Sequence, residues 1–149
     1  MKPIALFLKI SAVLWIIWGL VHVFAGVMTM NFILSGDTAG AIAGIADAVD
    51  PESLQLDYPD AAGAVIGQHG FNLFWIGLVT LISGPLIWKQ KKTAIWLAAL
   101  TGGLADVGYF LFMDLGSYVN FVPGTVMTLV SGTAIILSFY AWNKSKKQA

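Results

Sequence analysis

Residues 63–88, GAVIGQHGFNLFWIGLVTLISGPLIW, contain no charged side chain and are long enough to cross a lipid bilayer as one helix. A bilayer core of about 30 Å requires around 20 mostly apolar residues per helical crossing. Three further stretches meet this criterion, at about residues 4–30, 93–113 and 121–142. Four such stretches in 149 residues leave no amphipathic shell to cover them. We therefore predict an all-α, polytopic integral membrane protein that forms one membrane domain over residues 1–149.

The composition excludes several classes of protein. Hydrophobic residues make up 58% of the chain and charged residues 11%, whereas an ordinary soluble domain carries roughly a quarter charged residues. This excludes a soluble globular domain, a disordered chain and a nucleic-acid binder that uses a basic patch. Cysteine is absent, which excludes disulfides, thiolate metal sites and cysteine nucleophiles. Arginine is absent too, so no guanidinium can clamp a phosphate or carboxylate.

The charged residues are segregated by sign along the predicted topology. The lysines flank the start of the first span, the connection between the second and third, and the end of the fourth: Lys2, Lys9, Lys89, Lys91, Lys92, Lys144, Lys146 and Lys147. Seven of the eight acidic residues fall on the opposite side: Asp37, Asp47, Asp50, Glu52, Asp57, Asp60 and Asp114. Because short loops rich in lysine stay on the cytoplasmic side, we expect both termini to be cytoplasmic and the protein to lie in the inner (plasma) membrane.

The first apolar stretch is interpreted as a retained helix. It continues to Met30, which is too long for the apolar region of a signal peptide. After it, residues 31–62 form the one sizeable segment outside the membrane. Asp37 and Asp50 stand where helix N-caps are expected, and Pro51 follows Asp50 at a first helical position. This helical outer loop is either a solvated connector or a cap over the outer mouth of the helices.

Small residues indicate how the spans pack. Without a hydrophobic driving force between helices, association in lipid depends on side chains that permit close approach. Glycines recur at heptad spacing in the second span and more briefly in the first: Gly63, Gly70, Gly77 and Gly84, and Gly19 and Gly26. Heptad spacing keeps one face of a helix against a left-handed partner. With short connections, this favours an up-down-up-down four-helix bundle.

Ionisable side chains inside spans are costly and usually functional, so their depth matters. His22, His69 and Asp106 lie on three different spans, each roughly 9–12 Å below the outer boundary at 1.5 Å per residue. Further polar and aromatic side chains are candidates to support these residues by hydrogen bonds or to line a ligand pocket: Gln68, Asn72, Tyr109, Trp15, Trp18 and Trp75. The three tryptophans either fill the core or form the aromatic wall of a ligand pocket.

Four interpretations of the polar layer follow from the sequence. The first is packing: His22 or His69 donates a hydrogen bond to Asp106 and fixes the helix register. The second is a site for a transition metal or haem b, because two imidazoles and a carboxylate suit either centre. The third is an outward-facing pocket for a small hydrophobic molecule or lipid. In the fourth, the chain is a homo-oligomer or a non-catalytic accessory subunit of a larger membrane complex.

Overall fold

The computed structural model describes residues 3–146, and this part of the chain is helical without a strand. The long helices are α1 (Pro3–Leu34), α3 (Asp60–Trp88) and α6 (Val126–Lys146). Between α3 and α6, one continuous helical stretch consists of α4 (Lys92–Ala98), η2 (Ala99–Gly103), α5 (Leu104–Tyr109) and η3 (Phe110–Asp114), and a π-helical turn η4 (Phe121–Thr125) precedes α6. The predicted all-α class is confirmed.

Within residues 3–146, four helices are long and apolar enough to cross a membrane: Ile4–Leu34, Asp60–Trp88, Lys92–Asp114 and Phe121–Ser145. The predicted spans match these four, with differences at the ends. The first helix continues about one turn beyond the predicted end at residue 30, and the fourth continues to Ser145. The third contains the π-helical turns η2 and η3, which apolar composition alone does not reveal.

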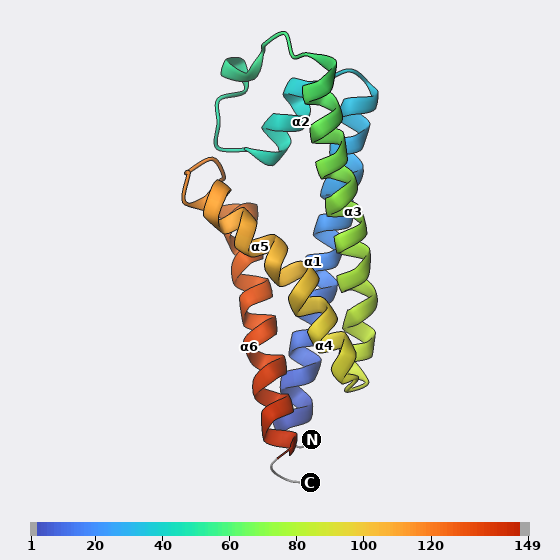
Figure 1. Ribbon diagram of the computed structural model, residues 1–149. Helices are drawn as coiled ribbons and strands as arrows, with labels where there is room; N and C mark the ends of the chain where they lie inside the picture. Colours follow the sequence, from blue (N-terminus) through green and yellow to red (C-terminus); the bar gives the residue numbers. More distant parts are fainter. Residues whose placement is uncertain (1–2, 147–149) are drawn as a thin grey trace.

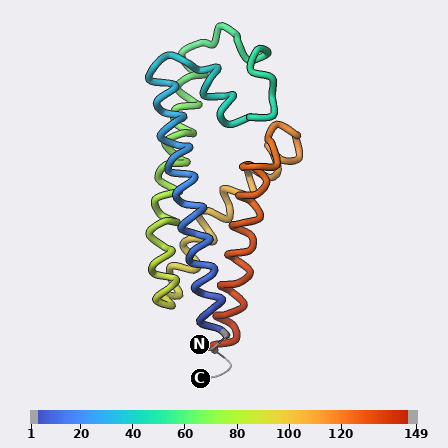
Figure 2. Tube along the Cα trace, turned by 180° about the vertical axis from the view of Figure 1, so that it is seen from behind, coloured from blue at the N-terminus to red at the C-terminus, as the bar shows by residue number. Residues whose placement is uncertain are grey.

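The helices run alternately along one long axis (Figures 1 and 2). Helix α1 rises from the end where α6 finishes, α3 returns beside it, the α4–α5 stretch rises again, and α6 descends. Helix α1 is central because it packs along both α3 and α6. The third stretch begins beside α3 at α4, then leans away from it, so that α5 lies against α6.

The glycines of α3 form the contact with α1. A Cβ atom built on Gly77 would lie 2.7 Å from the Val23 backbone nitrogen and 2.8 Å from the Gly19 carbonyl oxygen. One built on Gly26 would lie 2.6 Å from the Gly70 carbonyl oxygen. These distances are below any ordinary van der Waals contact, so only glycine permits this backbone approach. The seam is occupied inside the chain, and it therefore supplies no surface for a partner subunit.

Gly63 and Gly84 extend the same seam to both ends of α3. A Cβ atom on Gly84 would lie 3.0 Å from the Ala12 carbonyl oxygen, and one on Gly63 would lie 3.1 Å from the Thr38 hydroxyl oxygen. Gly63 therefore faces the outer segment, whereas Gly84 faces α1.

The core lies toward the end of the molecule where α1 begins and α6 ends. Trp15 and Trp18 are fully buried there among alanines and Ile87. A Cβ atom on Gly102 would lie 2.6 Å from Cζ3 of Trp15, so this glycine allows the third stretch to pack on the indole. Of the two roles predicted for these tryptophans, the structure shows core filling for Trp15 and Trp18.

The outer segment folds as its capping residues predict. Helix α2 (Thr38–Ile45) begins after Asp37, whose carboxylate accepts a 2.7 Å hydrogen bond from the Gly40 backbone nitrogen. The turn η1 (Pro51–Leu54) begins after Asp50, which accepts from the Glu52 backbone nitrogen at 3.0 Å. Beyond α2, Asp47 accepts from the Asn120 backbone nitrogen at 2.7 Å, which fastens the segment to the start of η4.

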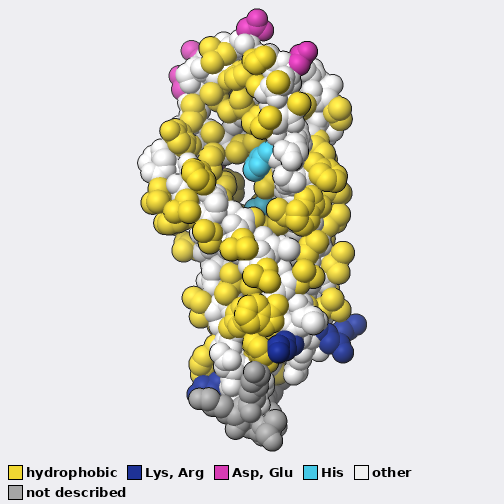
Figure 3. Space-filling view, in the orientation of Figure 1, with side chains coloured by type: hydrophobic (Ala, Val, Ile, Leu, Met, Phe, Trp, Pro, Cys, Tyr) yellow, Lys and Arg dark blue, Asp and Glu magenta, His cyan; other side chains and the backbone are white. Residues whose placement is uncertain are grey.

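Charge is segregated along the molecule as the sequence predicts (Figure 3). Acidic side chains gather at the end formed by the outer segment, and lysines gather at the opposite end. Lys9 lies over the Trp88 ring at 5.0 Å and Lys92 over the Trp142 ring at 4.5 Å. Lys2, Lys147 and the side chain of Lys146 lie outside the described residues.

We predict that Gly77→Ala destabilises the protein by about 1–3 kcal/mol, because the added methyl group overpacks the contact between α1 and α3. Gly132→Ala is the matched control, since a Cβ atom on Gly132 of α6 meets nothing within 4 Å. Thermal unfolding of both variants in detergent measures the difference. Equal midpoints for the two variants would show that the seam does not hold α1 against α3.

Candidate ligand-binding site

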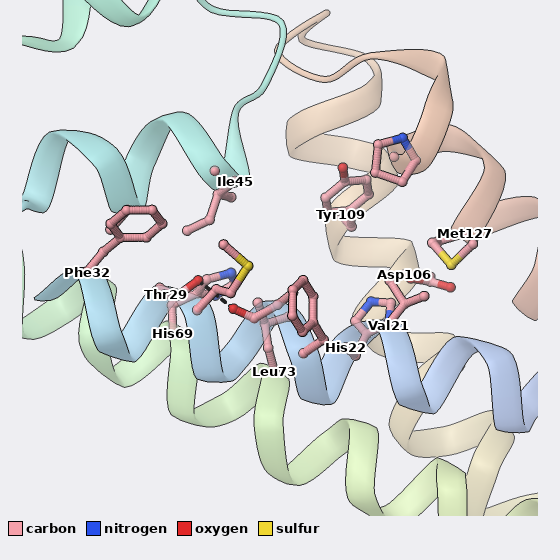
Figure 4. A pocket seen from close by; sticks show the side chains of 17 residues that line it. Val21, His22, Thr29, Phe32, Ile45, His69, Leu73, Asp106, Tyr109 and Met127 are labelled. Atoms are coloured by element: carbon pink, nitrogen blue, oxygen red, sulfur yellow. Dashed lines mark hydrogen bonds between the residues drawn. The ribbon is translucent and has the colours of Figure 1, made fainter.

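A cavity of about 270 Å³ lies among α1, α3, α5 and η4, beneath α2 (Figure 4). The α1 residues that line it fall between Val21 and Phe32, a distance of about 16 Å along the helix axis. Ala41, Gly44 and Ile45 of α2 form its roof. Most of the lining is apolar, as in typical pockets for small molecules. The cavity occupies the space that opens where α5 leans away from α3.

The three predicted site residues all line this cavity. His22 reaches it from α1, His69 from α3 and Asp106 from α5. Tyr109, one turn beyond Asp106, also lines it, as does Thr29 of α1. The structure therefore places the polar layer deduced from helix depth around one cavity.

Asp106 is held by an indole. The Trp18 Nε1–H group donates a 2.8 Å hydrogen bond to Oδ2 of Asp106, whose side chain is only 4% exposed. The Ser131 hydroxyl of α6 is a further hydrogen-bonding neighbour of this carboxylate. The prediction that His22 or His69 donates to Asp106 is wrong. Trp18 lies one turn before His22 on the same face of α1, and it supplies the donor instead.

His22 is fixed in orientation by its own helix. Its Nδ1 atom lies 2.9 Å from the Trp18 carbonyl oxygen, and its ring stacks on the Trp18 indole at 3.5 Å between centroids with an interplanar angle of 15°. The Nδ1 edge therefore faces the α1 backbone. The opposite Nε2 edge is left for the cavity.

Within residues 3–146, no group of three His, Asp or Glu side chains is placed to hold a metal ion. The predicted transition-metal site at His22, His69 and Asp106 is therefore not assembled, although all three line the cavity. Oδ2 of Asp106 meets the Trp18 indole, and Nδ1 of His22 meets the Trp18 carbonyl oxygen. The haem b prediction gains no support, because a cavity of about 270 Å³ is below the range for drug-sized ligands.

Of the six predicted neighbours, only Tyr109 lines the cavity. Gln68 is exposed. Asn72 accepts a 3.0 Å hydrogen bond from the Trp75 indole, whose side chain is 39% exposed. The predicted wall of three tryptophans is therefore absent from the described lining: Trp15 and Trp18 fill the core, and Trp75 faces outward.

Sequence reasoning missed several lining residues. Thr29 lies seven residues after His22, which places both on one face of α1, so heptad spacing could have identified it. Met127 and Gly124 come from the start of the fourth span and carry no comparable signal. The α2 residues of the roof could not be found by depth, because they lie outside the predicted spans.

Comparison with known proteins adds no family assignment: no family model, curated protein or solved structure matches this chain. The chemistry of the site therefore follows from its own geometry. The arrangement combines apolar walls with a few polar groups on three helices, which suits recognition of a small amphipathic molecule.

We predict that Trp18→Phe destabilises the protein by about 1–3 kcal/mol, because the buried Asp106 carboxylate loses its indole donor. Trp75→Phe removes a similar bond at an exposed position, and its effect should stay within about 0.5 kcal/mol. Unfolding in detergent measures both variants. Adding Asp106→Leu to Trp18→Phe should restore part of the lost stability, because the carboxylate that needs the indole donor is then gone. If the stability losses of the two single variants simply add in the double variant, Trp18 and Asp106 do not interact.

Proposed function

We propose that this chain is a multi-pass membrane protein that binds a small, membrane-dissolved molecule in the cavity beneath α2. The observation that carries the proposal is a largely apolar cavity with unused hydrogen-bonding groups on three helices. Within residues 3–146, no protein partner engages Nε2 of His22, the ring nitrogens of His69 or the Tyr109 hydroxyl. Polar groups at such depth need partners, and a bound ligand would provide them.

The four apolar helices and the segregated charges support insertion as an up-down-up-down bundle. Lysines at one end fit the cytoplasmic side of an inner or plasma membrane, and the acidic outer segment fits the other side. In this orientation the first and last described residues are cytoplasmic, and the cavity lies in the outer half of the bilayer.

A lateral entrance supports a ligand that arrives through the lipid. Phe24 and Met28 line the cavity and are also 65% and 40% exposed, so they form an apolar rim on the side of the molecule. Figure 3 shows histidine side chains inside a hollow that apolar side chains surround. A molecule dissolved in the bilayer would reach the histidines without passing through water.

The position of helix α2 also supports the proposal. Its residues close the outer end of the cavity, and the Asp47–Asn120 pair holds the segment in place. Asn120 donates twice to Asp47, from its backbone nitrogen to the carboxylate and from its side-chain amide to the Asp47 carbonyl oxygen at 2.9 Å. Such a roof would separate the bound molecule from water on the outer side.

We predict that a cysteine at Ser53→Cys reacts with a membrane-impermeant maleimide in intact cells, whereas one at Thr93→Cys reacts only after the cells are opened. Both positions are exposed, and the chain has no other cysteine. Ser53 lies in the acidic outer segment and Thr93 beside the lysines of the second connection. Labelling of Thr93→Cys in intact cells would contradict the proposed orientation.

We predict that Ala25→Phe abolishes co-purification of a small hydrophobic molecule, because Ala25 lines the cavity and a phenyl ring would fill it. Val27→Phe is the matched control, since Val27 lies on the same helix, is 38% exposed and does not line the cavity. Mass spectrometry of solvent extracts should find the molecule at about one per chain in the wild type and the control. The same extract from all three proteins would refute cavity binding.

A further inference from the structure

On the cavity wall formed by α1, the polar side chains already use their hydrogen-bond donors on the backbone. A carbonyl oxygen only accepts, so the 2.9 Å contact between Nδ1 of His22 and the Trp18 carbonyl places the hydrogen on Nδ1. In an uncharged imidazole the other nitrogen then carries a lone pair. Because a charge at membrane depth is costly, we take the His22 ring to be uncharged. Nε2 of His22 is therefore an acceptor.

Thr29 has the same character. The Thr29 hydroxyl donates to the Ala25 carbonyl oxygen at 2.9 Å, which uses its single hydrogen and leaves only lone pairs. Asp106 accepts through Oδ2 from the Trp18 indole. His22 and Thr29 thus form an acceptor wall on α1. His69 and Tyr109, which also line the cavity, can each donate and accept.

A ligand without a donor would leave this wall unpaired, and a buried unpaired acceptor is unfavourable. Thr29 is less available than His22, because it is only 5% exposed. His22 is also the member whose ring is fixed twice, by the hydrogen bond at Nδ1 and by stacking on Trp18. Nε2 of His22 is therefore the acceptor best placed to select a ligand.

We propose, resting on the function proposed above, that the ligand is a neutral hydroxyl-bearing amphiphile, an alcohol or phenol. Its O–H group donates to Nε2 of His22, and its apolar tail leaves the cavity past Phe24 and Met28 toward lipid. A cavity of about 270 Å³ has room for a ring or headgroup, and the lateral rim lets a longer tail remain outside. His69 and Tyr109 also line the cavity and can bond the same headgroup oxygen.

The test compares 4-hexylphenol with 4-hexylanisole, its methyl ether, on the full chain in lipid nanodiscs. The two probes share a ring, a tail and an oxygen that can accept, but only the phenol can donate. Equilibrium dialysis, with protein-free nanodiscs to subtract partitioning into lipid, gives the affinity ratio. We expect the phenol to bind roughly fivefold more tightly or better, as one additional hydrogen bond would provide.

Two variants test which residue is responsible for tighter binding of the phenol. His22→Phe keeps an aromatic ring that can stack on Trp18 but removes the acceptor, and the ratio should fall to about one. His69→Phe removes a group that can donate to the oxygen of either probe, so the ratio should stay near the wild-type value. A stable fold in each variant is checked by its unfolding midpoint relative to the wild-type protein.

Each outcome is decisive. A phenol preference that disappears only in His22→Phe supports the proposal. Equal binding of both probes to the wild type, or a preference that survives in His22→Phe, overturns the hydroxyl assignment and leaves the cavity as a binding site. Failure of both probes to bind in excess of protein-free nanodiscs overturns the hydroxyl assignment and argues against the binding function itself.

Discussion

The approach of α1 to α3 along the glycine seam is the constraint on which the other features depend. Because the backbone at Gly19 faces that at Gly77, α1 is fixed in rotation about its own axis. An adjacent stripe of α1 is thereby turned toward the third helical stretch, and it runs from Trp15 through Trp18 to His22. In its inner half this stripe is core, where Trp15 and Trp18 are fully buried. In its outer half it becomes the wall of the cavity.

The change from core to cavity is a consequence of the third helical stretch. At Gly102 the missing side chain lets this stretch pack directly on the Trp15 indole. One or two turns later, the Trp18–Asp106 hydrogen bond still joins α1 to α5. Beyond that bond α5 leans toward α6 (Figure 1), and the cavity lies at this level of α1. Asp106 therefore lies at the inner end of the cavity, and His22 lies beside it on α1.

Much of this arrangement was accessible from the sequence, because it depends on length, spacing and depth. Apolar length locates the four helices to within about a turn, heptad glycines predict the face of α3, and a rise of 1.5 Å per residue places His22, His69 and Asp106 in one layer. The hydrogen-bond partner of Asp106 was missed, because an indole one turn away on α1 reaches as far as a neighbouring imidazole. The lean of α5 was missed too, since it arises from backbone geometry that composition does not encode.

The same geometry explains how an apolar cavity could discriminate between ligands. Burial of a tail supplies affinity, but it distinguishes poorly between molecules of similar shape. Discrimination comes from polar groups that a wrong ligand leaves unpaired. Here the α1 backbone holds the hydrogens of His22 and Thr29, and Trp18 occupies one oxygen of Asp106. The α1 wall has thus committed its donors before any ligand arrives, and the selectivity at His22 follows from the hydrogen that its own helix has already used.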